Sequence, residues 1–147
     1  MKYFLTVPAL LAFILVGCAT TPPADQSATP NRLAKAQSPE QAVTARAQAR
    51  WDAVIAADYE KAYVFLSEGF RDVTPLDAYR LKQANNPFKI KSAYIAKVRC
   101  EEADACTASV TLTVETLMPS VGTKQFYSTE EEPWFLQGEQ WFHVPPK

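Results

Sequence analysis

The hydrophobic pattern of this sequence changes its period at Pro87. Before this residue, apolar side chains recur every three or four positions, as on one face of an α-helix. After it, apolar and polar side chains alternate, as in β-strands with one buried face. Helices followed by a run of antiparallel strands predict an α+β fold over residues 38–147.

Start and stop signals delimit three predicted helices. The first begins at Ser38, where Pro39 and Gln41 complete a capping box. Its core face comprises Val43, Ala47, Trp51, Val54 and Ile55. Its expected solvent side comprises Arg46, Gln48 and Arg50. The second helix is capped by Asp58 and stops at Gly69, and the third runs from a capping box at residues 74–77 to Asn85.

The alternating half of the chain predicts four strands, separated by turns at residues 101–105, 119–122 and 137–139. In the first strand, Phe88, Ile90 and Tyr94 share a face with Val98. The other, wet face carries Lys89, Lys91, Lys97 and Arg99. Cys100 and Cys106 flank the first turn, within reach of each other in an antiparallel pair, so an oxidising compartment favours a disulfide between them.

The N-terminal residues resemble the signal peptide of a bacterial lipoprotein precursor. Lys2 precedes an apolar run that ends at Val16, shorter than the ~20 residues that cross a bilayer. The sequence Leu15-Val16-Gly17-Cys18 is similar to a lipobox. This resemblance implies removal of residues 1–17 and attachment of diacylglycerol and a further acyl chain, such as palmitate, at Cys18. The alternative is an ordinary cleaved signal peptide with a chance cysteine.

The same resemblance implies a location in the cell envelope. Two or more acyl chains anchor a protein stably, so the membrane is one expected partner. Ala19-Thr20 lacks the Asp that usually retains lipoproteins at the inner membrane, which favours the periplasmic face of the outer membrane. Residues 18–37 are polar and rich in proline, and they predict a disordered tether between Cys18 and the domain.

Composition argues against several functions. The formal net charge is −1 and no basic cluster is present, so no nucleic-acid partner is expected. No glycine-rich phosphate loop and no zinc spacing occur, and we expect no cofactor and no metal. The run Glu130-Glu131-Glu132 with the acidic turn at residues 101–104 allows calcium as an alternative, but solvated charges are the usual reading of such runs.

Residues 38–145 resemble the nuclear-transport-factor-2-like superfamily. The resemblance rests on a helix with Trp51 on its core face, the sequence Asp58-Tyr59-Glu60-Lys61-Ala62-Tyr63, and a final strand that begins Gly138-Glu139-Gln140-Trp141. It implies a cone in which the helices pack in the concave face of a curved antiparallel sheet. The superfamily contains isomerases and dehydratases as well as binding modules, so the fold leaves function open.

Candidate site residues are few, and each has a structural reading. Asp58 is a candidate base or a helix cap, and His143 is a candidate general acid–base or a half-exposed strand residue. The superfamily's catalytic pairs have no match, so no catalytic residue is assigned. Candidate pocket-lining residues, which are equally candidates for the core, are Trp51, Tyr63, Tyr94, Trp134, Trp141 and His143.

Two functions follow for the domain. The first is a non-catalytic module that binds an apolar ligand or an unknown envelope protein. The second is a small isomerase, dehydratase or hydrolase that uses the cone as its active site. A buried, converging set of ionisable groups within reach of one cavity distinguishes the second from the first. We favour the first.

The lipobox makes a direct prediction about processing. Intact-mass analysis of membrane-extracted protein is expected to give a chain that starts at Cys18 and carries added acyl mass. The variant Cys18→Ala is expected to accumulate as an unlipidated precursor, because its side chain cannot form the thioether. An unmodified soluble protein with another N-terminus would contradict the assignment.

Overall fold

The computed structural model describes residues 37–146. The predicted signal peptide of residues 1–17, Cys18 and most of the predicted tether lie outside the described residues. The helices are α1 (Pro39–Ile55), α2 (Tyr59–Tyr63), α3 (Glu68–Val73) and α4 (Leu76–Ala84). The strands are β1 (Lys89–Glu102), β2 (Ala105–Met118), β3 (Gly122–Gln137) and β4 (Gln140–His143). Within residues 37–146, no helix has the length and apolar character needed to cross a membrane.

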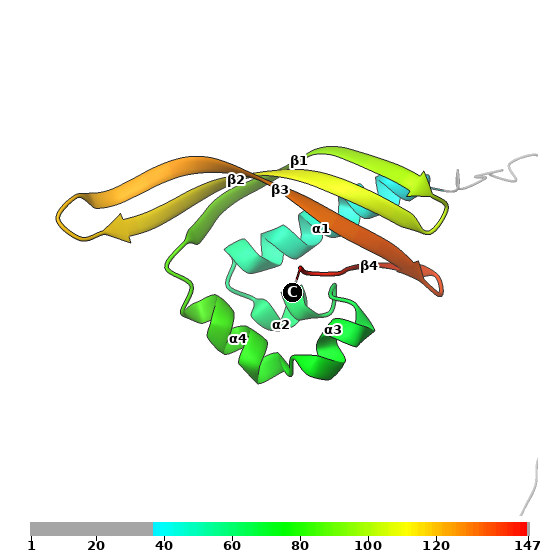
Figure 1. Ribbon diagram of the computed structural model, residues 1–147, viewed down its shortest axis with the longest axis horizontal. Coiled ribbons are helices and arrows are strands. Elements are labelled where there is room, and N and C mark those ends of the chain that lie inside the picture. Colours follow the sequence, from blue (N-terminus) through cyan, green and yellow to red (C-terminus); the bar gives the residue numbers. More distant parts are fainter. Residues whose placement is uncertain (1–36, 147) are drawn as a thin grey trace, which may run out of the picture. The chain divides into compact units, whose positions relative to one another are not determined.

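The strands form one antiparallel sheet in the order β1-β2-β3-β4. Figure 1 shows this sheet arching over α1, with α2, α3 and α4 on the side of α1 that faces away from the sheet. Two backbone hydrogen bonds of 2.9 Å fix β4 to the α2–α3 connection, from Ser67 N to His143 O and from His143 N to Phe65 O. The expected α+β fold, with helices in the concave face of a curved sheet, is confirmed.

The sequence of α1 explains why this helix fills the concave face. Ser38 and Gln41 form the predicted capping box, and Val43 and Ala47 are fully buried against the sheet. The expectation that Arg50 faces solvent is wrong, because only 6% of the residue is exposed. Val43, Ala47, Arg50 and Val54 are spaced by four, three and four residues, which places Arg50 on the apolar stripe itself.

The connection after α2 differs from the prediction. Gly69 does not stop a helix but lies within α3, because Ser67 acts as an N-cap and its Oγ accepts from Phe70 N at 3.3 Å. The predicted capping box at Thr74 is also absent: Thr74 ends α3, and α4 begins after Pro75 with no side-chain cap. Asp58 does cap α2, accepting from Lys61 N at 3.1 Å.

The alternation predicted for β1 is interrupted by register shifts between Ile90 and Ser92 and between Ile95 and Lys97. An extra residue in one strand exchanges the two faces, because side chains alternate with a period of two. Ile95, expected on the wet face, is therefore buried, and Tyr94, expected on the inner face, is 68% exposed.

Strand β2 supplies the most regular part of the core. Its buried residues are Cys106, Ala108, Val110, Leu112, Val114 and Thr116. They pack with Val43, Ala47 and Trp51 of α1 and with Trp134 and Trp141. Cys106 lies opposite Cys100 on β1, and the two residues form the expected disulfide.

Candidate functional site

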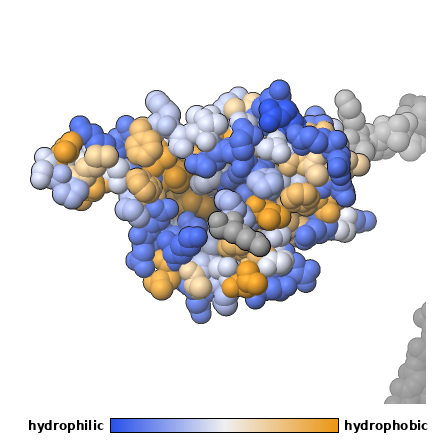
Figure 2. All heavy atoms as spheres, viewed as in Figure 1, coloured by the Kyte–Doolittle hydropathy of each residue, from blue (hydrophilic) through white to orange (hydrophobic). Residues whose placement is uncertain are grey.

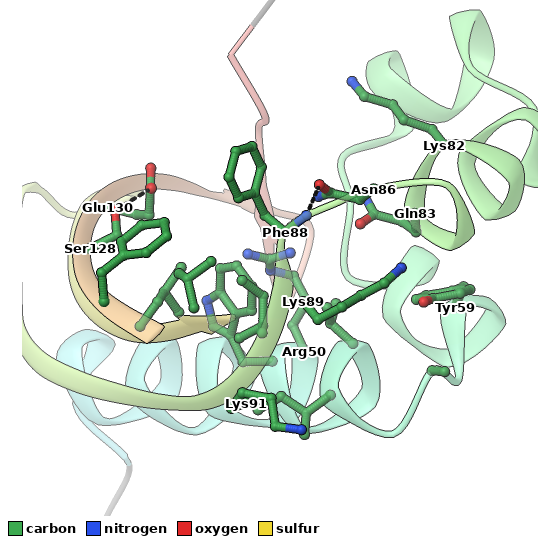
Figure 3. Close-up of a pocket in the computed structure, with 18 of the residues that line it drawn as sticks. Arg50, Tyr59, Lys82, Gln83, Asn86, Phe88, Lys89, Lys91, Ser128 and Glu130 are labelled. Carbon is green, nitrogen blue, oxygen red and sulfur yellow. Dashed lines mark hydrogen bonds between the residues drawn. The ribbon is translucent and has the colours of Figure 1, made fainter. Parts of the chain in front are cut away.

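A cavity of about 1020 Å³ opens where the C-terminal end of α1 meets the end of α4 and the start of β1. Figure 2 shows a hollow with an apolar floor on this face of the domain. Apolar lining comes from α1, β1, β2 and β3 and comprises Trp51, Val54, Ile55, Phe88, Ile90, Leu112, Val114 and Phe126. Polar and charged lining comprises Arg50, Lys82, Gln83, Asn86, Lys89, Lys91, Ser128 and Glu130 (Figure 3).

Arg50 forms a buried ion pair with Glu132 behind the wall of this cavity. The Arg50 Nη2 atom of α1 donates to Glu132 Oε1 of β3, and the two side chains are 8% and 5% exposed. Ala108, which is fully buried, lies opposite Glu132 on β2. Its small side chain leaves room for the guanidinium between α1 and the sheet. The pair therefore joins the central helix to the centre of the sheet.

The ion pair lies among buried polar atoms that lack a hydrogen-bond partner within the described part of the chain. These atoms are Arg50 Nε, Trp51 Nε1, Tyr79 Oη, Glu132 Oε2 and Trp134 Nε1. The indole N–H groups of Trp51 and Trp134 lie near enough to the Glu132 carboxylate to lower its pKa, but neither reaches hydrogen-bonding geometry. Five such atoms in one small region make this the most polar part of the interior.

Burial and charge act in opposite directions on Glu132. Burial raises the pKa of its carboxyl above the ordinary value, because the charged form loses its hydration. Arg50 and the two indole N–H groups oppose this rise. Burial likewise raises the pKa of Tyr79, so the phenol stays neutral.

His143 is buried rather than half-exposed, with 5% of its surface accessible. Burial and, to a smaller extent, the positive charge of Arg50 lower the pKa of its imidazole to about 3, against a hydrogen bond to Pro133 that raises it. Its Nδ1 lies 3.0 Å from Pro133 O. Because a carbonyl only accepts, Nδ1 carries the proton of a neutral ring. The centroid of the imidazole ring lies 5.6 Å from the centroid of the Trp134 ring.

The candidate lining residues do not converge on the cavity. Trp51 lines it, whereas Tyr63, Tyr94, Trp141 and His143 do not. The Tyr63 hydroxyl donates to Thr74 O at 2.7 Å and closes the helical layer. Tyr94 is exposed on β1, and Trp141 is part of the core.

The acidic run on β3 is divided between surface and interior. Glu131 accepts from Ser109 Oγ at 2.6 Å and lies 3.7 Å from Arg99, and Glu130 lies at the cavity. The reading of all three as solvated charges is wrong for Glu132, which alternation places on the same face as Trp134. Among residues 37–146, no group of three or more His, Cys, Asp or Glu side chains is arranged to hold a metal ion.

Sequence reasoning missed the Arg50–Glu132 pair, although both signals were present. Arg50 occupies the apolar stripe of α1 by its spacing, and Glu132 stands two residues before a buried tryptophan in an alternating strand. A charged residue on each of two predicted core faces indicates a buried pair, because an isolated buried charge is too costly. Lys82 and Lys89 are close in sequence, but that they line one cavity with Arg50 and the apolar residues of β2 and β3 depends on tertiary packing, which no local pattern specifies.

No protein-family model matches this chain, and no curated protein matches it by sequence. Solved structures do match. A SEC-C motif-containing protein from Rhodopseudomonas palustris is 12% identical over 69% of this chain and 73% of that chain, with a TM-score of 0.55. The association domain of CaMKII from C. elegans is 14% identical over 71% of this chain and 89% of that chain, with a TM-score of 0.50.

A putative NTF2-like transpeptidase from Campylobacter jejuni also matches, at 10% identity over 68% of this chain and 94% of that chain, with a TM-score of 0.46. Identities this low establish the fold alone. The domain has the α+β fold expected from the sequence, with helices packed in the concave face of a curved antiparallel sheet.

The burial of His143 gives a prediction that nuclear magnetic resonance tests directly, because the chain contains one histidine. In untagged folded protein, the imidazole Cε1–H signal is expected to stay at its neutral position from about pH 8 to about pH 4.5. In urea-unfolded protein, it should titrate near the ordinary pKa of about 6.5.

The same shift has a defined effect on stability. The folded pKa lies below the unfolded one, so below about pH 6.5 only the unfolded chain takes up this proton. The contribution of His143 to the free energy of unfolding is therefore fully present above about pH 6.5. It decreases as the pH falls from there towards 3. The raised pKa of Glu132 acts in the opposite direction. A folded-state titration midpoint near 6.5 would contradict the buried neutral imidazole.

Proposed function

We propose that this chain is a lipid-anchored envelope lipoprotein whose cone-shaped domain is a non-catalytic module that binds a small apolar ligand in its cavity. The lipobox at Leu15-Val16-Gly17-Cys18 supports the anchor, and with it a position on the periplasmic face of the outer membrane. The tether of residues 18–37 then sets how far the domain extends from the membrane.

The observation that carries the binding role is the cavity itself. Its volume of about 1020 Å³ is at the upper end of the range for small-molecule sites, which spans about 300–1,000 Å³. Trp51, Leu112 and Val114 form apolar walls from α1 and β2. These walls belong to the continuous core of the domain, so the site is held by rigid elements rather than by loops.

The position of the buried ionisable groups supports binding over catalysis. An acid–base site needs at least two such groups that can reach one substrate. Of Arg50, Glu132, Tyr79 and His143, only Arg50 lines the cavity. Arg50 is itself paired with Glu132, and the Nδ1–H of the neutral His143 donates to Pro133 O. The enzymatic alternative therefore lacks a pair of buried acid–base groups that face the cavity.

A neutral dye tests the binding role without involving charge. Nile red is expected to bind saturably at one site and to accept excitation energy from Trp51 in the wall. The variant Ile55→Glu should weaken this binding at least about tenfold, because it places a carboxylate at the apolar wall. Ile55 is 37% exposed, so the fold should tolerate the change.

Val64→Glu is the matched control. Val64 is a 49% exposed aliphatic residue beyond the end of α2 that does not line the cavity, and the substitution adds the same charge. The control should bind Nile red as well as the original chain does. No saturable binding to the original chain, or equal losses in both variants, would refute a ligand-binding cavity.

A further inference from the structure

The charges that line the cavity differ in sign from the charge of the whole chain. The formal net charge is −1. The lining, however, contains the cationic side chains Arg50, Lys82, Lys89 and Lys91 and a single carboxylate, Glu130. A concave site lined by one sign of charge over apolar walls concentrates its field and attracts ligands of the opposite sign.

Two of these cations have no carboxylate partner among the described residues. Within residues 37–146, no carboxylate lies within 4 Å of the amino group of Lys82 or Lys89. Lys91, in contrast, lies 3.7 Å from Glu115. Lys89 Nζ also donates to Ala84 O at 3.0 Å, at the end of α4, which holds its ammonium beside the cavity.

Figure 3 shows how the lining is divided. Lys82 and Lys89 extend from the end of α4 and the start of β1, and Arg50 lies on the same side. Ser128 and Glu130 lie across the cavity on β3, where Ser128 Oγ donates to Glu130 Oε1 at 3.1 Å. The carboxylate is therefore separated from the two free lysines.

Arg50 adds a second, independent feature. It is 6% exposed and lines the cavity, and its Nε finds no hydrogen-bond partner within the described part of the chain. Because only Nη2 is paired among the described residues, with Glu132 on the far side, the guanidinium adds positive potential to the wall of the cavity.

The apolar part of the cavity completes the chemistry of the ligand. Leu112 and Val114 of β2 provide aliphatic surface, and Phe88 and Phe126 meet edge to face with their centroids 6.3 Å apart. A ligand that satisfies both regions needs an apolar body and one acidic group.

We propose that the ligand is a single-chain amphiphilic anion, in which an apolar tail ends in a carboxylate, sulfate or phosphate monoester. Lys82 and Lys89 bind the acidic group, Arg50 adds positive potential behind them, and the tail lies along Leu112, Val114 and Phe126. This inference rests on the proposed binding function and specifies the ligand of the same cavity.

Three probes with the same ten-carbon tail test the proposal: decanoate, 1-decanol and decyltrimethylammonium. Each is titrated below its critical micelle concentration into the chain of residues 18–147 carrying Cys18→Ser, so that neither an attached acyl chain nor the apolar run of residues 5–16 competes for the cavity. Tryptophan fluorescence follows binding, because Trp51 lines the site. Decanoate is expected to bind at least about tenfold more tightly than decanol, and the cation most weakly. The preference for decanoate should shrink as salt is added.

Matched double variants assign the effect to the two lysines. Lys82→Gln with Lys89→Gln should weaken decanoate binding about tenfold and leave decanol binding unchanged. Lys61→Gln with Lys97→Gln removes the same charge from exposed positions that do not line the cavity, and it should leave both affinities unchanged.

The outcomes separate the two proposals. Equal affinities for decanoate and decanol, or equal losses in both lysine pairs, would overturn the anionic ligand and leave the binding module standing. Binding of none of the three probes would overturn both. Sedimentation with phosphatidylglycerol vesicles in the absence of decanoate binding would identify a membrane-docking surface instead and would also overturn the anionic ligand.

Discussion

The ion pair between Arg50 and Glu132 is the interaction on which this domain depends. Each partner alone would be an uncompensated charge in an apolar core, and removal of one partner of such a pair typically costs about 3–5 kcal/mol. The pair also fixes geometry, because it joins the C-terminal part of α1 to β3 beside the small residue Ala108. The apolar contacts between α1 and the sheet are non-directional, so they do not fix the position of the helix in the same way. The ion pair therefore specifies where along the sheet the helix lies.

That position has consequences for the cavity. The cavity lies beside the ion pair, and its lining includes the last residues of α1 and the start of β1, with Trp51 and Val114 in its wall. The same arginine contributes positive potential to the wall, and Lys82 and Lys89 add charges that no nearby carboxylate cancels within the described residues. One buried contact thus links the architecture of the cone to the chemistry that we propose for its ligand. The neutral His143 beneath it completes the packing on Trp134 rather than a proton-transfer site.

Periodicity and capping signals predicted the fold class, the limits of α1 and the antiparallel meander, because these depend on local spacing. They also placed Cys100 opposite Cys106. The errors lie where tertiary structure decides. Register shifts in β1 exchanged Tyr94 and Ile95 between faces, and Ser67 began a helix where Gly69 suggested an end. Arg50 and Glu132 were predicted to be solvent-facing charges, although both lie on apolar faces by their spacing. Lys82 and Lys89 are close in sequence, but tertiary packing places them at one cavity with Arg50 and the apolar residues of β2 and β3.

A double-mutant cycle on the ion pair tests this account most directly. The free energy of unfolding is measured in urea at pH 7 for the original chain, Arg50→Met, Glu132→Met and the double variant. We expect each single change to cost about 3–5 kcal/mol. Glu132→Met should cost more, because Glu132 can take up a proton when left alone, whereas a guanidinium cannot lose one. The double variant should lose less than the sum of the single changes by about 2 kcal/mol or more. If each single variant lost less than about 1 kcal/mol of unfolding free energy, and the two losses added in the double variant, the pair would behave like a surface ion pair. That result would contradict the central role of Arg50 and Glu132.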